Sequence, residues 1–409
     1  MALVRSFVVP LEELTGGCPN QTPTYALRDL LGGDVSGVDT SKSHFQNTYG
    51  ARHGEWVKMN GGNSELPTVS LASFIGECGG CVVGDEPTLE QRLTAGQIDA
   101  VFRRHGFLYL TDFGVSEEDV RVVFNNMKRL FALNDEEKAK LSKFDPRMNT
   151  GFSKFATEAL NTLRPPDLKE SFNIRSRKHY TNDYTGTPEG FGDVAESFWD
   201  KLEEASRRLF IACALAMKLP REDMRFFERT FRRFDFSTMR MLHFPPVGDF
   251  STDKLTRDGD ALRIGEHTDF GMVTLLFHDA ESAGEGLQVK KADAGAGNDA
   301  SGVACTNTGW IDAISRGGAT AIVNTGALIA RWTNDEWRAT AHRVVVPNDA
   351  AAGRDRYSLA FFLDPDKDCV IETHPRFSDA VNKYKPITSG GFVQMKIEEM
   401  LKVQGKATY

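Results

Sequence analysis

Two histidines and one carboxylate in the second half of the chain have the types and the order that suit a metal ion. His267 and Asp269 are separated by a single residue, and His342 follows far downstream. Two histidines and one carboxylate form one face of the octahedral ligand set of non-haem Fe(II) oxygenases, which leaves three positions open. A bidentate 2-oxo acid can fill two of these positions and O2 the third. His267, Asp269 and His342 are therefore candidate iron ligands and candidate catalytic residues.

The local sequence around these residues carries more weight than their spacing. A second His-x-Glu pattern, at His53 and Glu55, shows how readily such a spacing arises by chance. In a strand, however, residues i and i+2 share a face, and the candidate pair directly precedes the apolar run VTLLFH. His342 opens a further strand-like run, HRVVVP. We therefore expect neighbouring strands to bring the three ligands together in space.

Arg356 and Ser358 enter a third strand-like run, RYSLAFFL. A guanidinium buried in such a strand requires an anionic partner, because an unpaired buried charge is costly. A carboxylate is the natural partner, since it accepts two parallel N–H bonds from arginine. We therefore predict that Arg356 binds the carboxylate of a cosubstrate.

The elements that must position these residues change in character near Phe234. Before this point apolar residues recur at helical spacing, whereas the segments from there to Leu363 are short, β-branched and separated by turns. The expected order is a helical first half, an antiparallel sandwich or barrel, and a terminal helix. Helices are expected at 88–104, 116–132, 135–143, 188–218 and 393–403, early strands at 66–74 and 107–111, and a low-complexity loop at 292–302.

The composition is that of a soluble globular protein and excludes several functions. The 409 residues include 49 basic and 57 acidic side chains, which gives a net charge of −8. Non-specific nucleic-acid binding requires a basic surface, and no apolar run approaches the roughly 20 residues of a membrane span. The six cysteines, including the Cys78/Cys81 pair of an expected surface loop, form no disulfide framework. We therefore expect a cytoplasmic protein with no nucleic-acid and no membrane partner.

Collinear motifs from about Leu66 to the C-terminus resemble those of one enzyme family. They include RHGFLYLTDFGV, FALNDEEKAKL, GEHTDFGMVTLLF, TGWIDA and NTGALIARWTNDEWRATAHRVVVP. The sequence resembles the Fe(II)/2-oxoglutarate-dependent dioxygenases of the plant and fungal small-molecule type, which include isopenicillin N synthase-like enzymes. The resemblance implies a mainly β fold with flanking helices and a distorted double-stranded β-helix (jelly-roll) core. The implied regions are an N-terminal extension (1–65), a mostly helical region (66–230), the jelly-roll core (231–375) and a C-terminal helical segment (376–409).

The resemblance also implies a role for each candidate residue. His267, Asp269 and His342 match the iron ligands of the family, and Arg356 and Ser358 match the pair that holds the distal carboxylate of 2-oxoglutarate. The implied cofactors are Fe(II), the cosubstrate 2-oxoglutarate and O2. The implied reaction hydroxylates, desaturates or cyclises a small-molecule substrate in secondary-metabolite biosynthesis. The sequence does not determine the oligomeric state and is compatible with a monomer.

One departure from the family pattern lies in the strand before the first iron ligand. Where the family often has Asn-Tyr-Tyr-Pro, this chain has Leu242, His243, Phe244 and Pro245, so some contacts to 2-oxoglutarate must differ. By alternation, Arg240 shares a strand face with Leu242 and Phe244. If this face points inward, Arg240 reaches the pocket and could bind a substrate carboxylate.

Substrate contacts are expected from two further segments. The run ESFNIRSR resembles a family strand that faces the pocket, and Phe362 follows the Arg-Ser pair at a position that tends to line it. The candidate substrate residues are Phe172, Asn173, Arg175, Arg240 and Phe362. Three cationic candidates, Arg164, Arg175 and Arg240, favour a carboxylate-bearing substrate such as an amino-acid derivative.

Three other functions fit parts of the pattern. An isopenicillin N synthase-like oxidase has the same iron ligands but needs no 2-oxoglutarate, and its Arg-Ser pair holds the substrate instead. A non-catalytic jelly-roll binding module would bind no iron. An oxygenase of macromolecules would act on an intact peptide or oligonucleotide. Dependence of product formation on 2-oxoglutarate separates the first alternative from the main hypothesis.

Overall fold

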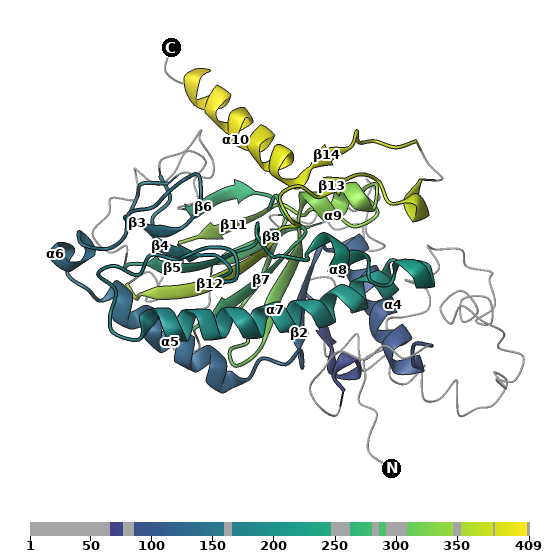
Figure 1. Cartoon of the computed structure of the whole chain (residues 1–409), viewed down its shortest axis with the longest axis horizontal. Helices are drawn as coiled ribbons and strands as arrows, with labels where there is room; N and C mark the ends of the chain where they lie inside the picture. The colour runs from purple at the N-terminus through teal and green to yellow at the C-terminus, as the bar shows by residue number, and fades with distance from the viewer. Residues whose placement is uncertain are drawn as a thin grey trace, which may run out of the picture.

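The computed structural model describes residues 66–76, 86–158, 166–246, 262–279, 286–291, 309–346, 353–378 and 381–406. The predicted extension before Leu66, the Cys78/Cys81 pair, Arg164 and the predicted 292–302 loop lie outside these ranges. Within them, the chain forms three β-sheets, and long helices run across the largest one (Figure 1). The smallest sheet pairs β13 (Val370–Ile371) with β14 (Ile387–Thr388) near the C-terminus and does not contribute to the site.

The larger sheet contains strands from both halves of the chain. It has eight strands in the order β1-β2-β10-β7-β12-β5-β4-β3. They are β1 (Thr68–Ser70), β2 (Phe107–Thr111), β10 (Ala321–Thr325), β7 (Val273–His278), β12 (Arg356–Leu363), β5 (Thr238–Phe244), β4 (Glu170–Ile174) and β3 (Gly151–Ser153). All neighbours are antiparallel except β1 and β2, which are parallel. The first half of the chain therefore supplies four strands, and the expectation that it is helical holds only for the layer outside the sheet.

The smaller sheet faces the larger one across an apolar interior. It has four strands in the order β6-β11-β8-β9. They are β6 (Leu262–His267), β11 (His342–Val345), β8 (Leu287–Lys290) and β9 (Trp310–Asp312). Phe107 and Leu242 of the larger sheet and Ile264 and Val344 of the smaller one belong to a single buried cluster. This packing of one sheet on the other is that of an open jelly roll.

Three long helices, α4 (Leu89–Arg104), α5 (Glu117–Phe131) and α7 (Phe191–Ala216), form the outer layer. Thr88 and Ser116 cap α4 and α5 and complete capping boxes with Gln91 and Asp119. On α7, Phe198 packs against Phe277 and Trp199 against Phe361, both from the larger sheet. The helices thus seal one face of the larger sheet and leave its other face for the interior between the sheets.

Four elements differ from the prediction. The early strand expected at 66–74 covers only Thr68–Ser70 and is followed by a 3-10 helix at Ala72–Phe74. Helix α6 (Asp135–Lys138) ends earlier than expected, and α9 (Ala327–Trp332) interrupts the second half, which we expected to be all-β. Helix α9 begins after Gly326, where a Cβ atom would lie 2.4 Å from the carbonyl oxygen of Gly271, so this close approach favours glycine. The terminal helix α10 (Ser389–Lys406) is longer than expected and projects from the body (Figure 1). In the part of the chain that the structure describes, no helix combines the length and the apolar character that crossing a membrane requires.

Candidate active site

A cavity of about 600 Å³ lies between the two sheets and contains the chemistry that the sequence predicts. Its volume is that of a typical small-molecule site. The lining includes His267, Asp269, His342, Arg356 and Ser358. The strands of the jelly roll therefore bring all five predicted iron and cosubstrate residues to one cavity.

The pairing of β6 with β11 explains how residues far apart in sequence meet. His342 lies directly opposite His267 in the ladder, with 4.2 Å between the ring centroids. Asp269 follows the end of β6, and its Oδ1 lies 3.8 Å from His267 Nε2 and 3.7 Å from His342 Nε2. One potential ligand atom from each residue lies within 4.8 Å of the other two. Three donors on one side of a shared centre are the arrangement that an octahedral Fe(II) ion requires.

Hydrogen bonds set the orientation of each of the three side chains. His267 Nδ1 donates to the carbonyl oxygen of Gly265 at 2.8 Å, and His342 Nδ1 donates to that of Thr340 at 3.2 Å. Each Nδ1 therefore carries the proton, and each Nε2 keeps its lone pair for a metal. The carboxylate of Asp269 is held from behind by Thr274 and Asn324.

Asp269 is oriented by two neighbours and is ionised in its buried position. Its Oδ2 accepts hydrogen bonds from Thr274 Oγ1 at 2.6 Å and from Asn324 Nδ2 at 2.7 Å. Burial opposes ionisation, but His342 and His267 and these two hydrogen bonds outweigh it and lower the pKa of Asp269. Burial, followed by His267, lowers the pKa of His342 to about 4. At neutral pH, His342 is thus neutral and Asp269 is a carboxylate, and these are the protonation states that bind a divalent metal.

Arg356 presents unsatisfied donors to the same cavity. It is 3% exposed, and its Nη2 donates to His278 Nε2 at 2.7 Å. Its Nε and Nη1 have no hydrogen-bond partner among the described residues. Burial and the nearby Arg263 lower the pKa of Arg356 to about 9, which leaves it charged at neutral pH. A buried cation with free N–H groups fits the carboxylate of an oxo acid, with Ser358 two residues along the same strand.

His278 is the acceptor that fixes Arg356. It is 3% exposed, and it lies opposite Ser358 in the β7–β12 ladder. Burial and the adjacent Arg356 lower the pKa of His278 well below its usual value, so the imidazole is neutral. No local sequence pattern marks His278, because only strand pairing places it beside Arg356.

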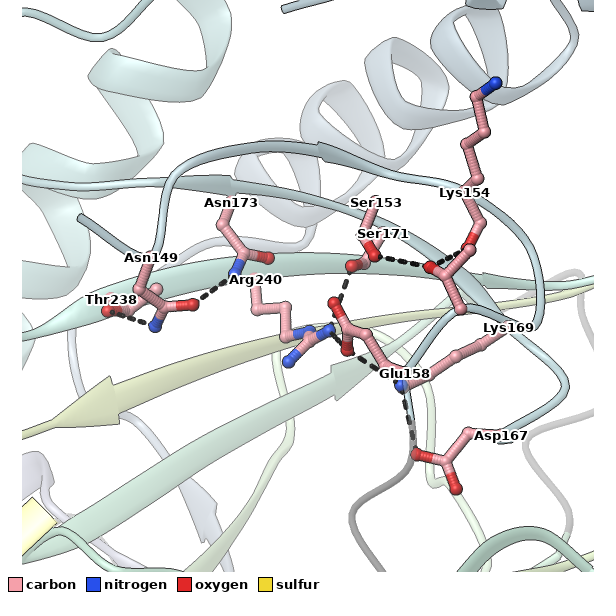
Figure 2. Close-up of polar contacts among 11 residues, drawn as sticks. Asn149, Ser153, Lys154, Glu158, Asp167, Lys169, Ser171, Asn173, Thr238 and Arg240 are labelled. Carbon is pink, nitrogen blue, oxygen red and sulfur yellow. Dashed lines mark hydrogen bonds and ion pairs between the residues drawn. The ribbon is translucent and has the colours of Figure 1, made fainter. Parts of the chain in front are cut away.

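The cavity also contains a hydrogen-bonded group of side chains that we call the polar wall. It consists of Asn149, Glu158, Asp167, Lys169, Asn173 and Arg240 (Figure 2). Asn149, Lys169 and Arg240 line the cavity, and the other three lie behind or beside them. Sequence reasoning identified only Asn173 and Arg240 of this group.

Of the five predicted substrate residues, two line the cavity and three do not. Arg240 and Phe362 line the cavity. Asn173 does not line it, but its Nδ2 donates to Asn149 Oδ1 at 2.9 Å, so it supports a residue that does. The parity of β4 places Phe172 on the other face of the sheet, where it packs on Tyr184 and Phe191.

Arg175 also lies away from the cavity, contrary to our expectation of a substrate contact. Its Nη1 donates to the carbonyl oxygen of Asp235 at 2.7 Å, and its guanidinium lies 5.3 Å from the ring centroids of Tyr180 and Phe236. These contacts are structural, so Arg175 does not support the expectation of a cationic substrate pocket.

Comparisons with known proteins agree with the fold and with the site. The family described as non-haem dioxygenase in morphine synthesis N-terminal matches residues 66–189, and the 2OG-Fe(II) oxygenase superfamily matches residues 236–365. The proline hydroxylase buaE of Petromyces alliaceus is 32% identical to the chain, with 67% of this chain and 82% of the relative covered. The 2-oxoglutarate-Fe(II) type oxidoreductase hxnY of Emericella nidulans is 28% identical, with 75% and 82% covered.

A solved structure extends the likeness to three dimensions. The full-length Neurospora crassa protein in complex with alpha-ketoglutarate (2-oxoglutarate) superposes with a TM-score of 0.64 and 29% identity, covering 81% of this chain and 96% of that one. The chain belongs to the 2OG-Fe(II) oxygenase superfamily. It has the jelly-roll fold of that family and is an Fe(II)- and 2-oxoglutarate-dependent oxygenase of small molecules.

Proposed function

We propose that this oxygenase holds Fe(II) with His267, Asp269 and His342 and holds the distal carboxylate of 2-oxoglutarate with Arg356 and Ser358. The observation that carries the proposal is that a set of potential metal ligands and a buried guanidinium with unpaired N–H groups lie in the same cavity. Metal-binding atoms from the first three residues lie within 4.8 Å of one another, and Arg356 has two N–H groups without partners among the described residues.

In this proposal the chain positions and protects the reactants. Iron and 2-oxoglutarate, when bound, supply an oxidation by O2 that is coupled to decarboxylation of the oxo acid. The chain fixes the ligand atoms through Gly265, Thr340, Thr274 and Asn324. Apolar lining residues keep water from the reacting centre and aim one C–H bond of the substrate at it; they include Leu242, Leu276, Val344 and Phe362.

The biological setting of the reaction is part of the same proposal. The names of the relatives, which include a proline hydroxylase and several 2-oxoglutarate-dependent dioxygenases from fungi, support a small-molecule substrate in secondary metabolism. We assign the hydroxylation, desaturation or ring-closing chemistry to 231–375 with support from 66–230. We further propose that the enzyme is cytoplasmic.

The test is decarboxylation of 2-oxoglutarate by the purified full chain supplied with Fe(II) and O2. We expect slow, substrate-independent release of succinate, which His342→Ala abolishes. The matched control is His179→Ala, because His179 is an exposed histidine outside the cavity. Equal succinate release by the wild-type protein and His342→Ala would contradict the proposed iron site.

A further inference from the structure

The polar wall is joined to the cosubstrate side of the cavity by the ladder between β5 and β12. Phe244 pairs with Arg356, Leu242 with Ser358, and Arg240 with Ala360. Arg240 therefore lies on the same face of β5 as Phe244 and Leu242, two residues along the strand from Leu242. On the other side of β5, β4 pairs Asn173 with Arg240. The polar wall is therefore next to the residues of β5 that pair with Arg356 and Ser358.

The charges of the polar wall neutralise one another. Arg240 Nη2 forms an ion pair with Glu158 Oε2 and donates to Ser171 Oγ at 3.0 Å. Lys169 Nζ lies 3.0 Å from Glu158 Oε2 and 3.1 Å from Asp167 Oδ2. Two cations therefore face two carboxylates, and Figure 2 shows Glu158 between Arg240 and Lys169.

The carboxylate of Glu158 keeps its charge at neutral pH. Burial opposes ionisation, but Arg240 and Lys169 outweigh it and lower the pKa of Glu158 to about 2. A substrate carboxylate at this position would compete with a fixed internal carboxylate for the same cations. Like charges at close range cost several kcal/mol when they are shielded from water.

Lys396 of α10, the other lysine among the described lining residues, is paired in the same way. Its Nζ lies 2.8 Å from Glu399 Oε2. Of the described cationic residues that line the cavity, Arg356 is thus the one without a carboxylate partner, and it belongs to the cosubstrate side. The substrate side offers no unpaired cation from the described residues.

The hydrogen-bonding capacity left in the wall suits an uncharged group. Asn149 donates through Nδ2 to Thr238 Oγ1 at 3.2 Å and accepts from Asn173 Nδ2, so its carboxamide is fixed in orientation. A carboxamide held in this way retains a second N–H and a second lone pair. Arg240 Nε has no partner among the described residues. An amide or lactam carries the complementary carbonyl and N–H on one edge.

We propose that the cavity accepts an uncharged substrate whose amide- or lactam-type edge is bound by Arg240 and Asn149, and that Glu158 is the residue that excludes carboxylates. The inference rests on the proposed function, because it takes the part of the cavity around Arg356 and Ser358 as the cosubstrate site. It replaces the expectation of a carboxylate-bearing substrate. Glu158→Gln would leave Asp167 beside Lys169 but would remove the carboxylate partner that Arg240 has among the described residues, and so open the wall to an anion.

The test compares two probes of the same shape, phenylacetamide and phenylacetate. Their affinities are measured anaerobically, by ligand-observed NMR, on the full chain loaded with Zn(II) in place of iron and with 2-oxoglutarate. For the wild-type protein we expect the amide to bind at least about tenfold more tightly than the carboxylate. In Glu158→Gln, the affinity for the carboxylate should rise about tenfold, while that for the amide changes less than about threefold.

Glu118→Gln is the matched control. It removes the carboxylate of an exposed ion pair between Glu118 and Arg121 on α5, and Glu118 does not line the cavity. It should leave both affinities unchanged. A wild-type preference for the carboxylate, no binding of the amide, or an unchanged ratio in Glu158→Gln overturns the inference. The proposed function is tested separately by the succinate assay, so failure of the probe experiment with normal succinate release rejects the substrate class alone.

Discussion

The two sides of the cavity treat their charged groups in opposite ways. On the iron and cosubstrate side, the Oδ1 atom of Asp269 lies 3.8 Å and 3.7 Å from the Nε2 atoms of His267 and His342. The buried guanidinium of Arg356 has two nitrogen atoms, Nε and Nη1, without a hydrogen-bond partner among the described residues. On the polar wall, each cation is paired with a carboxylate within the chain. An unsatisfied buried charge is costly and signals a bound partner, whereas a neutralised group positions a substrate without binding an ion. The comparison therefore indicates where ions bind and where an uncharged molecule binds.

The largest effect that this comparison predicts concerns the metal. Asp269→Ala removes the single anionic ligand of the proposed iron site while leaving both histidines. We expect Fe(II) affinity to fall by at least about 100-fold and turnover by about 1,000-fold or more. Equilibrium dialysis with Fe(II) under anaerobic conditions measures the first effect, and the succinate assay measures the second. Wild-type iron affinity in this variant would show that Asp269 is not a ligand.

The free energy of unfolding should fall when a cation of the polar wall is removed, but not when the guanidinium of Arg356 is removed. Lys169→Met leaves Glu158 and Asp167 close together without their shared cation, and we expect it to lower the free energy of unfolding by about 3–5 kcal/mol. Arg356→Met removes a buried charge that has no counter-ion among the described residues, so the ligand-free protein should be as stable as the wild type or more stable. Urea denaturation of the metal-free proteins compares them. Equal destabilisation by both substitutions would refute the contrast.

The residues behind Asp269 should have a smaller effect on iron. Thr274→Val removes one of the two hydrogen bonds that orient the carboxylate and keeps the side-chain shape. We expect Fe(II) affinity to fall by about 10-fold to 100-fold, because residues that orient metal ligands contribute on that scale. Thr268→Val is the control, since Thr268 lies beside Asp269 in sequence and has no hydrogen bond to it among those found. Equal iron affinity in the two variants would show that Thr274 does not orient the carboxylate of Asp269 for the metal.

The smallest predicted effect concerns the histidine that holds Arg356. His278→Leu removes the acceptor of the Arg356 Nη2 bond, and we expect the affinity for 2-oxoglutarate to fall about tenfold with iron binding unchanged. His278→Gln supplies a side-chain oxygen as acceptor and should restore most of the affinity. Titration with 2-oxoglutarate at saturating Fe(II) measures both. A merely structural role would lower both affinities, and glutamine would not rescue them.

The sequence predicted that His267, Asp269, His342, Arg356 and Ser358 come together, as they do in the cavity, because the signals for these residues are local. His267 and Asp269 share a strand pattern, and Arg356 opens a β-rich run in which a charge has no structural explanation. The caps of α4 and α5 are likewise encoded within four residues. These parts of the fold depend on short-range rules, and the structure confirms the elements that they predict.

The polar wall could not be predicted in the same way because its contacts are non-local. Lys169 and Glu158 meet Arg240 only after β3, β4 and β5 have paired. Asn149 lines the cavity from a turn in which its φ is 54°, and nothing in the periodicity of the sequence marks that position. The error on Phe172 has a simple cause, since a change of one residue in a strand moves a side chain to the opposite face. Asn173, its neighbour, lies on the cavity side.

The central claim is that one cavity binds both Fe(II) and 2-oxoglutarate, and an anaerobic titration tests it most directly. Fe(II) and then 2-oxoglutarate are added to the metal-free protein while the visible absorption of the oxo acid chelated to iron is recorded. We predict that the band forms in the wild-type protein, is lost in His267→Ala, and requires much more 2-oxoglutarate in Arg356→Ala. Bound Fe(II) with no band in the wild-type protein would contradict the account and would assign Arg356 to the substrate of an oxidase that needs no oxo acid.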